Sequence, residues 1–487
     1  MSQQTLTSLE PRLLWHHFDA VSKIPRPSGH EKKISEYLIG FATKKGLPTI
    51  SDQAGNLVIK VPASPGKENS PTVIVQSHMD MVCEKNTDTK HDFFKDPIKT
   101  AVEGDFVKAV GTTLGADDGI GLSGALALVD DKDCIHGPLE LLFTVDEEIG
   151  LAGVNKLDPS IVSGRLLLNL DCGEDGVITI GCSGGVTSII SLKCQVQKTP
   201  AGVKAFEIKV GGLAGGHSGR YIHANRHNAI KLLSVALHRI VRETGALIFL
   251  ICGGDKHNAI PREALARIVV PRDKAPLLKE ITSGTGDFFK SIATTVDKDL
   301  KVEVREFAGR PRQVWTKQSG LKVLRLLKTL PHGVAAVSRD MPGLVETSNN
   351  LAAIKTVKNG IEITTSSRSM VKECMDLAID TIETSADIAG ADFRNENRYP
   401  GWKPDPCSQL LCKAKEAYKI SRGTEPVVQA VHVGLECGIL IEKLPGTQAI
   451  AFGPTILQAH SPTERVQISS VGNFYTLLRN ILKTLVS

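Results

Sequence analysis

Residues 71–80 read PTVIVQSHMD, an apolar run that ends in a histidine and an aspartate. Three later stretches repeat this arrangement of an apolar run followed by side chains that can bind a metal. They are PLELLFTVDEE at 138–148, RLLLNLD at 165–171 and QAIAFGPTILQAH at 448–460. Apolar runs of this length are typical of strands buried on both faces of a sheet. In open α/β sheets ligands bind beyond the carboxyl ends of the strands, and all four runs place their polar residues there.

Amphipathic helical patterns separate these predicted strands, at 31–45 (EKKISEYLIGFATKK) and at 118–131 (DGIGLSGALALVDD). The alternation predicts an α/β fold, with a catalytic domain whose mixed, mostly parallel sheet is covered by helices. The middle of the chain differs, because Asn359-Gly360 separates two alternating runs and indicates a β-hairpin. We therefore predict a second α+β domain inserted into the first. The predicted boundaries are 1–186 and 398–487 for the catalytic domain and 187–397 for the inserted domain.

The composition limits the classes of function. The chain has 487 residues, of which 41% are hydrophobic and 23% charged, as in ordinary globular proteins with two or three domains. Its 58 basic and 53 acidic residues give a net charge of +5, and no basic run is interleaved with aromatic residues, so we expect no nucleic-acid partner. We also expect no membrane partner, since no secretory signal and no apolar stretch of about 18 residues is present. The 10 scattered cysteines suit free thiols in the cytoplasm.

His78 and Asp80 are two residues apart in an extended segment, so their side chains point to the same side. His78 can bind a metal through one ring nitrogen, and Asp80 can orient that ring. A buried His–Asp pair without a metal explains this motif equally well. In GADDGIG, Asp117 can bridge two cations with its two oxygens, or an aspartate can simply cap the following helix.

Asp146, Glu147 and Glu148 follow the apolar run LELLFTV. Three carboxylates at one strand end repel one another unless cations neutralise them. Glu148 can bind a metal while Glu147 faces a water molecule, although an acidic surface turn would also fit. Asp171 ends another apolar strand.

His460 precedes Ser461-Pro462-Thr463-Glu464, which resembles a capping box with proline at the first helical position. We therefore predict a helix that starts here and holds His460 at the mouth of the sheet. A structural histidine is the alternative.

Together these motifs supply two imidazoles and three carboxylates. The predicted metal ligands are His78, Asp117, Glu148, Asp171 and His460. If Asp117 bridges, each of two metals has three protein ligands and an open position, as in catalytic zinc sites. Two such cations can activate a water molecule and polarise a carbonyl, with Glu147 as the general base. Imidazole and carboxylate ligands favour zinc, with cobalt or manganese as alternatives.

The order of these motifs resembles the aminoacylase/carboxypeptidase-G superfamily of co-catalytic zinc peptidases, and most closely its aminoacyl-histidine dipeptidases. The stretches that carry the resemblance are SHMDMVCEKN, GTTLGADDGIG, TVDEEIGLAG, NLDCGEDG, GGHSG, HVGLECG and AHSPTERV. The resemblance runs from about residue 10 to the end of the chain. It implies hydrolysis of unblocked dipeptides, including Xaa-His types such as carnosine. It also places His78 and Asp171 on one metal, Glu148 and His460 on the other, and Asp117 between them.

The resemblance further implies that Asp80 supports His78, and that the inserted domain, 187–397, is a lid that carries the contacts of a homodimer. His217 in GGHSG would polarise the scissile carbonyl, unless it is only a turn histidine held by glycines. Asn258 and Arg368 would grip the carboxylate of a small peptide substrate, or lie on the surface; the planar fork of an arginine suits that task. Glu436 would meet the free amine of the substrate, unless it is only a helix-turn acid. A deacylase acting on N-acyl amino acids and a non-catalytic binding protein are the alternative functions.

Overall fold

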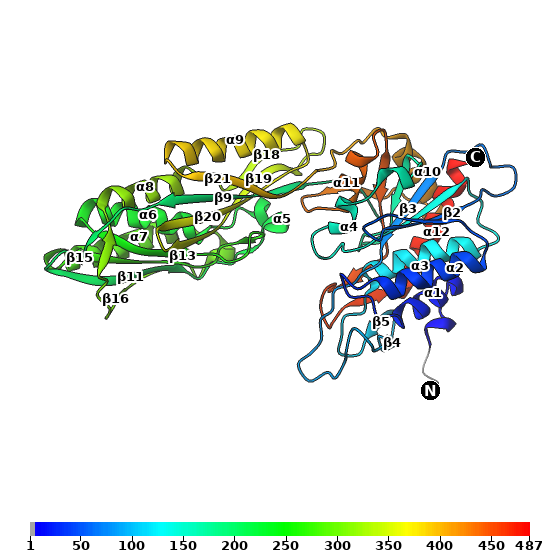
Figure 1. Ribbon diagram of the computed structural model, residues 1–487, viewed down its shortest axis with the longest axis horizontal. Coiled ribbons are helices and arrows are strands. Elements are labelled where there is room, and N and C mark those ends of the chain that lie inside the picture. The colour runs from blue at the N-terminus through cyan, green and yellow to red at the C-terminus, as the bar shows by residue number, and fades with distance from the viewer. Residues whose placement is uncertain (1–4) are drawn as a thin grey trace. The chain divides into compact units, whose positions relative to one another are not determined.

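The structure is a computed structural model that describes residues 5–487 (Figure 1). The chain divides into two compact units. One is discontinuous and consists of Met1–Cys182, Trp402–Val431 and Leu435–Ser487. The other, which we call the inserted unit, consists of Ser183–Gly401 and His432–Gly434. The predicted lid, 187–397, begins and ends four residues inside the long segment of the inserted unit.

The discontinuous unit is built on an eight-stranded sheet with the order β1-β2-β6-β3-β7-β23-β8-β22. Its strands are β1 (Thr49–Ser51), β2 (Leu57–Val61), β3 (Val73–His78), β6 (Leu139–Thr144), β7 (Leu166–Asn169), β8 (Val177–Cys182), β22 (Val427–Val431) and β23 (Gln448–Ala451). Strand β3 is parallel to β6 and β7, and β7 is parallel to β23, so four strands end at the same edge. Strands β1, β2 and β8 add antiparallel pairs. The predicted mixed α/β sheet is confirmed.

Helices cover this sheet. They are α1 (Arg12–Ser22), α2 (Lys32–Lys44), α3 (Ala116–Asp130), α4 (Ala152–Asn155), α10 (Gln409–Arg422), α11 (Glu436–Lys443) and α12 (Ile468–Leu485). Helix α3 packs on β3 and α1, while α10 packs on β23 and α12. Every side chain of β3 and β6 is buried, which explains why these strands are apolar runs instead of alternating patterns. Helices α2 and α3 confirm the two predicted helices, although α3 is buried on nearly all sides instead of being amphipathic.

A small four-stranded sheet in the same unit has the order β24-β25-β5-β4. Its strands are β4 (Thr100–Glu103), β5 (Phe106–Ala109), β24 (Ile456–Leu457) and β25 (Arg465–Gln467). Strand β25 pairs with β5 and with β24, which fixes the chain on both sides of the loop that carries His460.

The inserted unit contains a nine-stranded sheet with the order β16-β11-β15-β13-β19-β20-β9-β21, to which β18 adds beside β19. Its strands are β9 (Gly184–Lys193), β11 (Val203–Gly211), β13 (Leu247–Gly253), β15 (Ala264–Pro271), β16 (Lys301–Glu306), β18 (Gly333–Val337), β19 (Val345–Val357), β20 (Gly360–Ser369) and β21 (Asp392–Tyr399). The predicted hairpin is present, and because Val357 pairs with Gly360 its two turn residues are Lys358 and Asn359.

Four helices lie along this sheet: α6 (Ala229–Thr244), α7 (Ala275–Ile292), α8 (Lys317–Thr329) and α9 (Lys372–Ile388) (Figure 1). One apolar core joins α6, α7, α8 and α9 to the strands. The chain between β11 and α6 contains β12 (Gly216–His217), which pairs with β14 (Ala259–Ile260), a short strand between β13 and β15. Over residues 5–487, no helix combines the length and the apolar character needed to cross a bilayer.

Candidate metal centre and active site

The predicted metal ligands of the discontinuous unit gather at the edge where four parallel strands end. His78 is the last residue of β3, and Glu148 lies in the loop after β6. Asp171 follows β7, and His460 lies in the loop between β24 and β25. Asp117 is carried by the turn that opens α3, the helix that packs on β3.

The carboxylate of Asp117 lies between two imidazoles. Its Oδ1 is 3.1 Å from Nε2 of His78, and its Oδ2 is 3.2 Å from Nε2 of His460. Nε2 of His460 is also 3.0 Å from Oε1 of Glu148. The ligand atoms of His78, Asp117 and Glu148 all lie within 4.8 Å of one another. One carboxylate therefore presents an oxygen to each side of a compact cluster, which is the arrangement that a bridging ligand requires.

The adjacent residues Asp117 and Asp118 have different structural roles. Asp118 is buried, and its Oδ1 accepts a hydrogen bond from the amide of Gly121 at 3.1 Å, so Asp118 caps the helix. Neither Asp117 nor Asp118 has helical backbone angles, and the bond between them is cis. The helix-cap alternative thus applies to Asp118, and it leaves the carboxylate of Asp117 free to face the histidines.

Asp171 interacts electrostatically with the same cluster. Burial raises the pKa of Asp171 well above its usual range, and the negative charges of Asp117 and Glu148 raise it further. Burial likewise raises the pKa of Glu147, to which the charges of Asp171, Glu436 and Glu148 add. Several carboxylates therefore share one buried place, where positive charge is needed to keep them ionised.

The histidines show how strongly this place attracts positive charge. Hydrogen bonds to Asp117 and Glu148 raise the pKa of His460 to about 10. Although burial lowers it, hydrogen bonds to Asp117 and Asp80 raise the pKa of His78 well above its usual value. A divalent cation can supply this positive charge in place of the protons, and neutral imidazole with carboxylate is a donor set that suits zinc. The residues present therefore fit a metal centre.

Asp80 connects a histidine of the cluster to the acidic loop. It is fully buried, and its Oδ1 is 3.4 Å from Nδ1 of His78. Its two oxygens accept the amide hydrogens of Glu147 and Glu148, each at 3.1 Å, and Oδ2 also accepts the Ser28 hydroxyl at 2.7 Å. Burial opposes its ionisation, but the bond to His78 lowers the pKa of Asp80 to about 2. Asp80 thus orients one imidazole and the backbone of the loop that carries Glu147 and Glu148.

Glu436 lies beneath the same edge and is fully buried at the start of α11. Its Oε2 accepts hydrogen bonds from Gln76 at 2.6 Å and from Thr144 at 2.8 Å, and Asn169 donates in turn to Gln76 at 2.5 Å. Burial raises the pKa of Glu436 to about 7. Within residues 5–487 no hydrogen-bond partner reaches its Oε1. Sequence reasoning missed Gln76 and Asn169, which sit inside apolar runs and carry no motif.

The prediction that a helix starts at Pro462 is wrong. Residues after His460 form turns and then β25, and α12 begins only at Ile468. The carboxylate of Glu464 does not cap its own segment, because it accepts hydrogen bonds from backbone amides of the Asp117 turn. His460 is instead held in a loop with a φ of 63°.

In the inserted unit, His217 lies on the bridge between β12 and β14. The amide of the next residue, Ser218, donates to the backbone oxygen of Asn258 at 2.7 Å, which ties the His217 turn to the segment that carries Asn258. Burial lowers the pKa of His217 to about 4, and the positive charges of Arg368 and Arg220 add to this effect. The imidazole is therefore neutral at pH 7, and in this form it keeps one N–H that can donate a hydrogen bond.

Arg368 is a buried guanidinium in the same unit, on β20. Its Nη1 donates to the hydroxyl of Tyr399 at 3.0 Å. Its charge contributes to lowering the pKa values of His217, His257 and His432, so these side chains lie around it. Among residues 5–487 no carboxylate forms an ion pair with Arg368, and its Nε has no hydrogen-bond partner. A buried cation without a counter-ion is suited to binding an anionic group.

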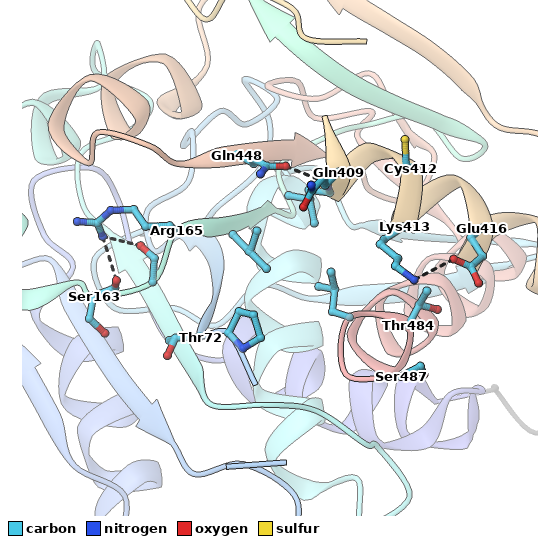
Figure 2. A pocket seen from close by; sticks show the side chains of 15 residues that line it. Thr72, Ser163, Arg165, Gln409, Cys412, Lys413, Glu416, Gln448, Thr484 and Ser487 are labelled. Carbon is cyan, nitrogen blue, oxygen red and sulfur yellow. Dashed lines mark hydrogen bonds and ion pairs between the residues drawn. The ribbon is translucent and has the colours of Figure 1, made fainter. Parts of the chain in front are cut away.

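A hollow of the discontinuous unit lies at the opposite edge of the sheet, where the parallel strands begin (Figure 2). It has a volume of about 680 Å³ and is lined by residues at the amino ends of β3, β7 and β23, together with α10 and the end of α12. Thr72, Arg165 and Gln448 mark these three strand ends (Figure 2). None of its lining residues is a predicted site residue.

Comparisons with known proteins identify the family of the chain. The sequence profile of Peptidase family M20/M25/M40 matches residues 74–484. The chain is 39% identical to the cytosol non-specific dipeptidase of Escherichia coli (strain K12) over 478 residues, which cover 98% of each chain. The crystal structure of aminoacylhistidine dipeptidase from Vibrio alginolyticus superposes with a TM-score of 0.93 at 36% identity, covering 99% of this chain and 98% of that one. Aminopeptidase PepT from Bacillus cereus shares the fold, with a TM-score of 0.58 at 17% identity over 98% and 100% of the two chains. The chain therefore belongs to peptidase family M20/M25/M40.

Proposed function

We propose that this protein hydrolyses the peptide bond of unblocked dipeptides at a pair of divalent metal ions. The observation that carries the proposal is the carboxylate of Asp117, which faces His78 on one side and His460 on the other. Two relatives that align over nearly the whole chain are named as dipeptidases, one non-specific and one acting on aminoacylhistidines. We therefore propose broad specificity that includes Xaa-His dipeptides such as carnosine.

The donor set supports an assignment of two metals. His78 and Asp171 would hold one ion, Glu148 and His460 the other, and Asp117 would bridge them; the 3.0 Å contact of His460 with Glu148 supports the second group. Zinc suits imidazole and carboxylate donors, and cobalt or manganese can replace it. When bound, the ions would activate the attacking water and polarise the scissile carbonyl.

Glu147 is our candidate for the general base. Its backbone is fixed by Asp80, and burial together with neighbouring charges raises its pKa. A carboxylate with a raised pKa can take a proton from the attacking water on its side-chain oxygen and then deliver it to the leaving amine. The carboxylate of Asp80 accepts the amides of both Glu147 and Glu148, so it fixes the backbone of the base and of the neighbouring metal ligand together.

The substrate's charged ends define the remaining roles. Arg368 is buried and lacks a carboxylate partner among the described residues, so we propose that it takes the substrate carboxylate together with Asn258. Neutral His217 would donate a hydrogen bond to the carbonyl oxygen as negative charge develops there. Glu436 would attract the free amine, and its Oε1, unpaired within the described chain, supports this role.

Activity on Ala-His and on N-acetyl-histidine tests the substrate class. We expect turnover of Ala-His, because the carboxylate of Glu436 should favour the ammonium group of a free dipeptide over an acetyl group. Turnover of the acetylated compound alone would instead identify a deacylase of the same family. A panel of dipeptides assayed on metal-stripped protein, with zinc, cobalt or manganese restored, would identify the metal.

A Glu147→Gln variant tests the chemistry. Glutamine preserves the size of the side chain but cannot take up a proton, so two metals should remain bound while kcat falls by about 10²–10⁴. Equal activity in variant and parent would remove Glu147 from this role. A protein that binds two metals and hydrolyses no dipeptide or acylated amino acid would be a binding protein.

We also propose that the protein acts in the cytoplasm as a homodimer assembled through the inserted unit. Support for the location comes from the name of the Escherichia coli relative and from the scattered positions of the ten cysteines in the sequence. Light scattering on the purified protein would test the assembly, and a monomer at all concentrations would reject it.

A further inference from the structure

Glu464 binds an entire turn of backbone by itself. Its Oε2 accepts the amide hydrogens of Leu114 at 2.8 Å and Gly115 at 3.0 Å, and its Oε1 accepts those of Ala116 at 2.8 Å and Asp117 at 3.4 Å. The side chain is buried, with an exposed fraction of 2%. These amides precede the regular part of α3 and have no carbonyl partner of their own in the helix, so one carboxylate satisfies them.

Arg26 holds the same turn from the opposite side. Its guanidinium is buried and donates to the carbonyl oxygens of Met79 at 3.0 Å, Asp80 at 2.6 Å and Gly115. Met79 and Asp80 directly follow His78, so one cation joins the segment of the first imidazole to the turn of Asp117. An arginine can do this because its planar fork carries five donors.

The backbone of the turn is shaped around this guanidinium. Gly115 has a φ of 67°, and a Cβ added there would lie 2.6 Å from Nη2 of Arg26. A Cβ added at Gly119 would lie 2.7 Å from the same nitrogen. A side chain at either position would therefore force the guanidinium of Arg26 to shift.

We infer that Arg26 and Glu464 are positioning residues that set the place of Asp117 between the two imidazoles; this inference rests on the proposed two-metal function. Arg26 ties the turn to the His78 segment. Glu464 ties it to the segment of His460, because Glu464 lies four residues after His460 and just before β25. The amide and the carbonyl of Gly115 are thus held by opposite charges from the two sides.

The hydrogen bonds of Arg26 and those of Glu464 should affect the binding of the two metals differently. Loss of the Glu464 carboxylate loosens the contact between Asp117 and His460, so the ion assigned to His460 should be weakened more than the ion assigned to His78. A glutamine at 464 keeps one acceptor oxygen but turns its NH2 group toward amide hydrogens that also donate. Residues that orient metal ligands typically change metal affinity by about 10–100-fold when they are substituted.

Glu140 provides a matched control at the other end of the sheet. It is also a glutamate with an exposed fraction of 2%, and it accepts the amides of Ser163 and Gly164, each at 2.9 Å, and the Ser163 hydroxyl at 2.7 Å. Substituting Glu140 with glutamine removes a comparable backbone anchor far along β6 from the metal ligands. A purely structural contribution would therefore appear equally in both variants.

The experiment measures zinc binding to metal-stripped parent, Glu464→Gln and Glu140→Gln proteins by competition with a chelator of known affinity. We expect the weaker zinc of Glu464→Gln to lose at least about tenfold in affinity, the tighter zinc to change less than about threefold, and kcat to recover at excess zinc. Glu140→Gln should bind both ions as the parent does. Parental affinity for both ions in folded Glu464→Gln, or equal losses in the two variants, would overturn the inference.

A second variant and the parent complete the design. Arg26→Lys keeps the charge but cannot reach three carbonyls at once, so it should also weaken zinc binding while the far-ultraviolet circular dichroism stays parental. If Glu464→Gln fails to fold, Arg26→Lys decides: parental zinc affinity in that folded variant would overturn the inference. If the parent itself binds fewer than two ions, it is the proposed function that fails.

Discussion

Replacing Asp80 with asparagine changes one buried oxygen into an NH2 group where four donors converge. The carboxylate accepts the amides of Glu147 and Glu148 and the Ser28 hydroxyl, and it faces Nδ1 of His78. Whichever oxygen is replaced, one buried amide loses its acceptor, which costs about 1–3 kcal/mol of folding free energy. The thermal midpoint should therefore fall by roughly 1–3 °C.

The same substitution should cost more in activity than in stability. If the NH2 group faces His78, the ring must accept at Nδ1 and carry its proton on Nε2, the atom that points to Asp117 at 3.1 Å. If the NH2 group takes the place of Oδ2, the amide of Glu148 loses its acceptor, and the backbone of this metal ligand is no longer anchored. In either orientation we expect kcat on Ala-His to fall by about 100-fold, since outer-shell partners of metal ligands carry effects of this size.

Steady-state kinetics at saturating zinc, with bound zinc measured in parallel, would check this expectation. Ser28→Ala is the matched control, because it removes one neutral donor from Asp80 and leaves the carboxylate in place. That variant should lose less than about tenfold in kcat. A folded Asp80→Asn protein with a kcat within about threefold of the parent would refute the reasoning and leave Asp80 only a structural role.

Three further outcomes are expected. Gly115→Ala should destabilise the protein by at least about 1 kcal/mol more than Gly46→Ala, since both glycines have nearly the same φ, 67° and 68°, but only the first faces Arg26; equal losses in denaturant unfolding would contradict this. Removing divalent metal with a chelator should abolish hydrolysis and lower the thermal midpoint, because the carboxylates then repel one another; an unchanged midpoint with full activity would count against a metal centre. Burial lowers the pKa of His432 to about 3, so the unfolded state binds a proton on this residue first as the pH falls below about 6.5. Between pH 7 and pH 5 the parent should therefore lose about 2 kcal/mol of folding free energy relative to His432→Gln, a variant that can keep the hydrogen bond to Ser348. Parallel pH profiles of the two proteins in guanidinium unfolding would exclude this contribution.

The strand ends could be predicted from the sequence because burial on both faces leaves a plain signature. An apolar run such as 139–144 has no alternation, and the polar residues after it mark the edge of the sheet. This pattern was sufficient to bring His78 and Asp171 to one place. Helical spacing of apolar residues was also sufficient for α2, whose buried residues share one face. The burial of α3 on nearly all sides depends on its neighbours in the fold, so its sequence indicated the helix but not its surroundings.

Local patterns were insufficient where a side chain serves a distant segment. Glu464 fits a capping box on its own segment, but the amide of Leu114 that it binds is 350 residues away in sequence. Arg26 carries no motif, and its role depends on carbonyl groups, which the sequence does not distinguish. The adjacent Asp117 and Asp118 have the same chemistry, and only the backbone angles of the turn decide which of them caps the helix.

The position of β23 limits when the eight-stranded sheet can be completed during synthesis of the polypeptide. Strands β7 and β8 follow one another closely in sequence, yet β23, made almost 270 residues later, lies between them. The inserted unit is nearly one continuous stretch and leaves the ribosome before that strand exists. A nascent chain therefore keeps a gap in its first sheet, with unpaired backbone groups on both sides, until the last tenth of the protein arrives. Because His460 follows β23 in the sequence, a nascent chain shorter than 460 residues lacks one of the five predicted ligands.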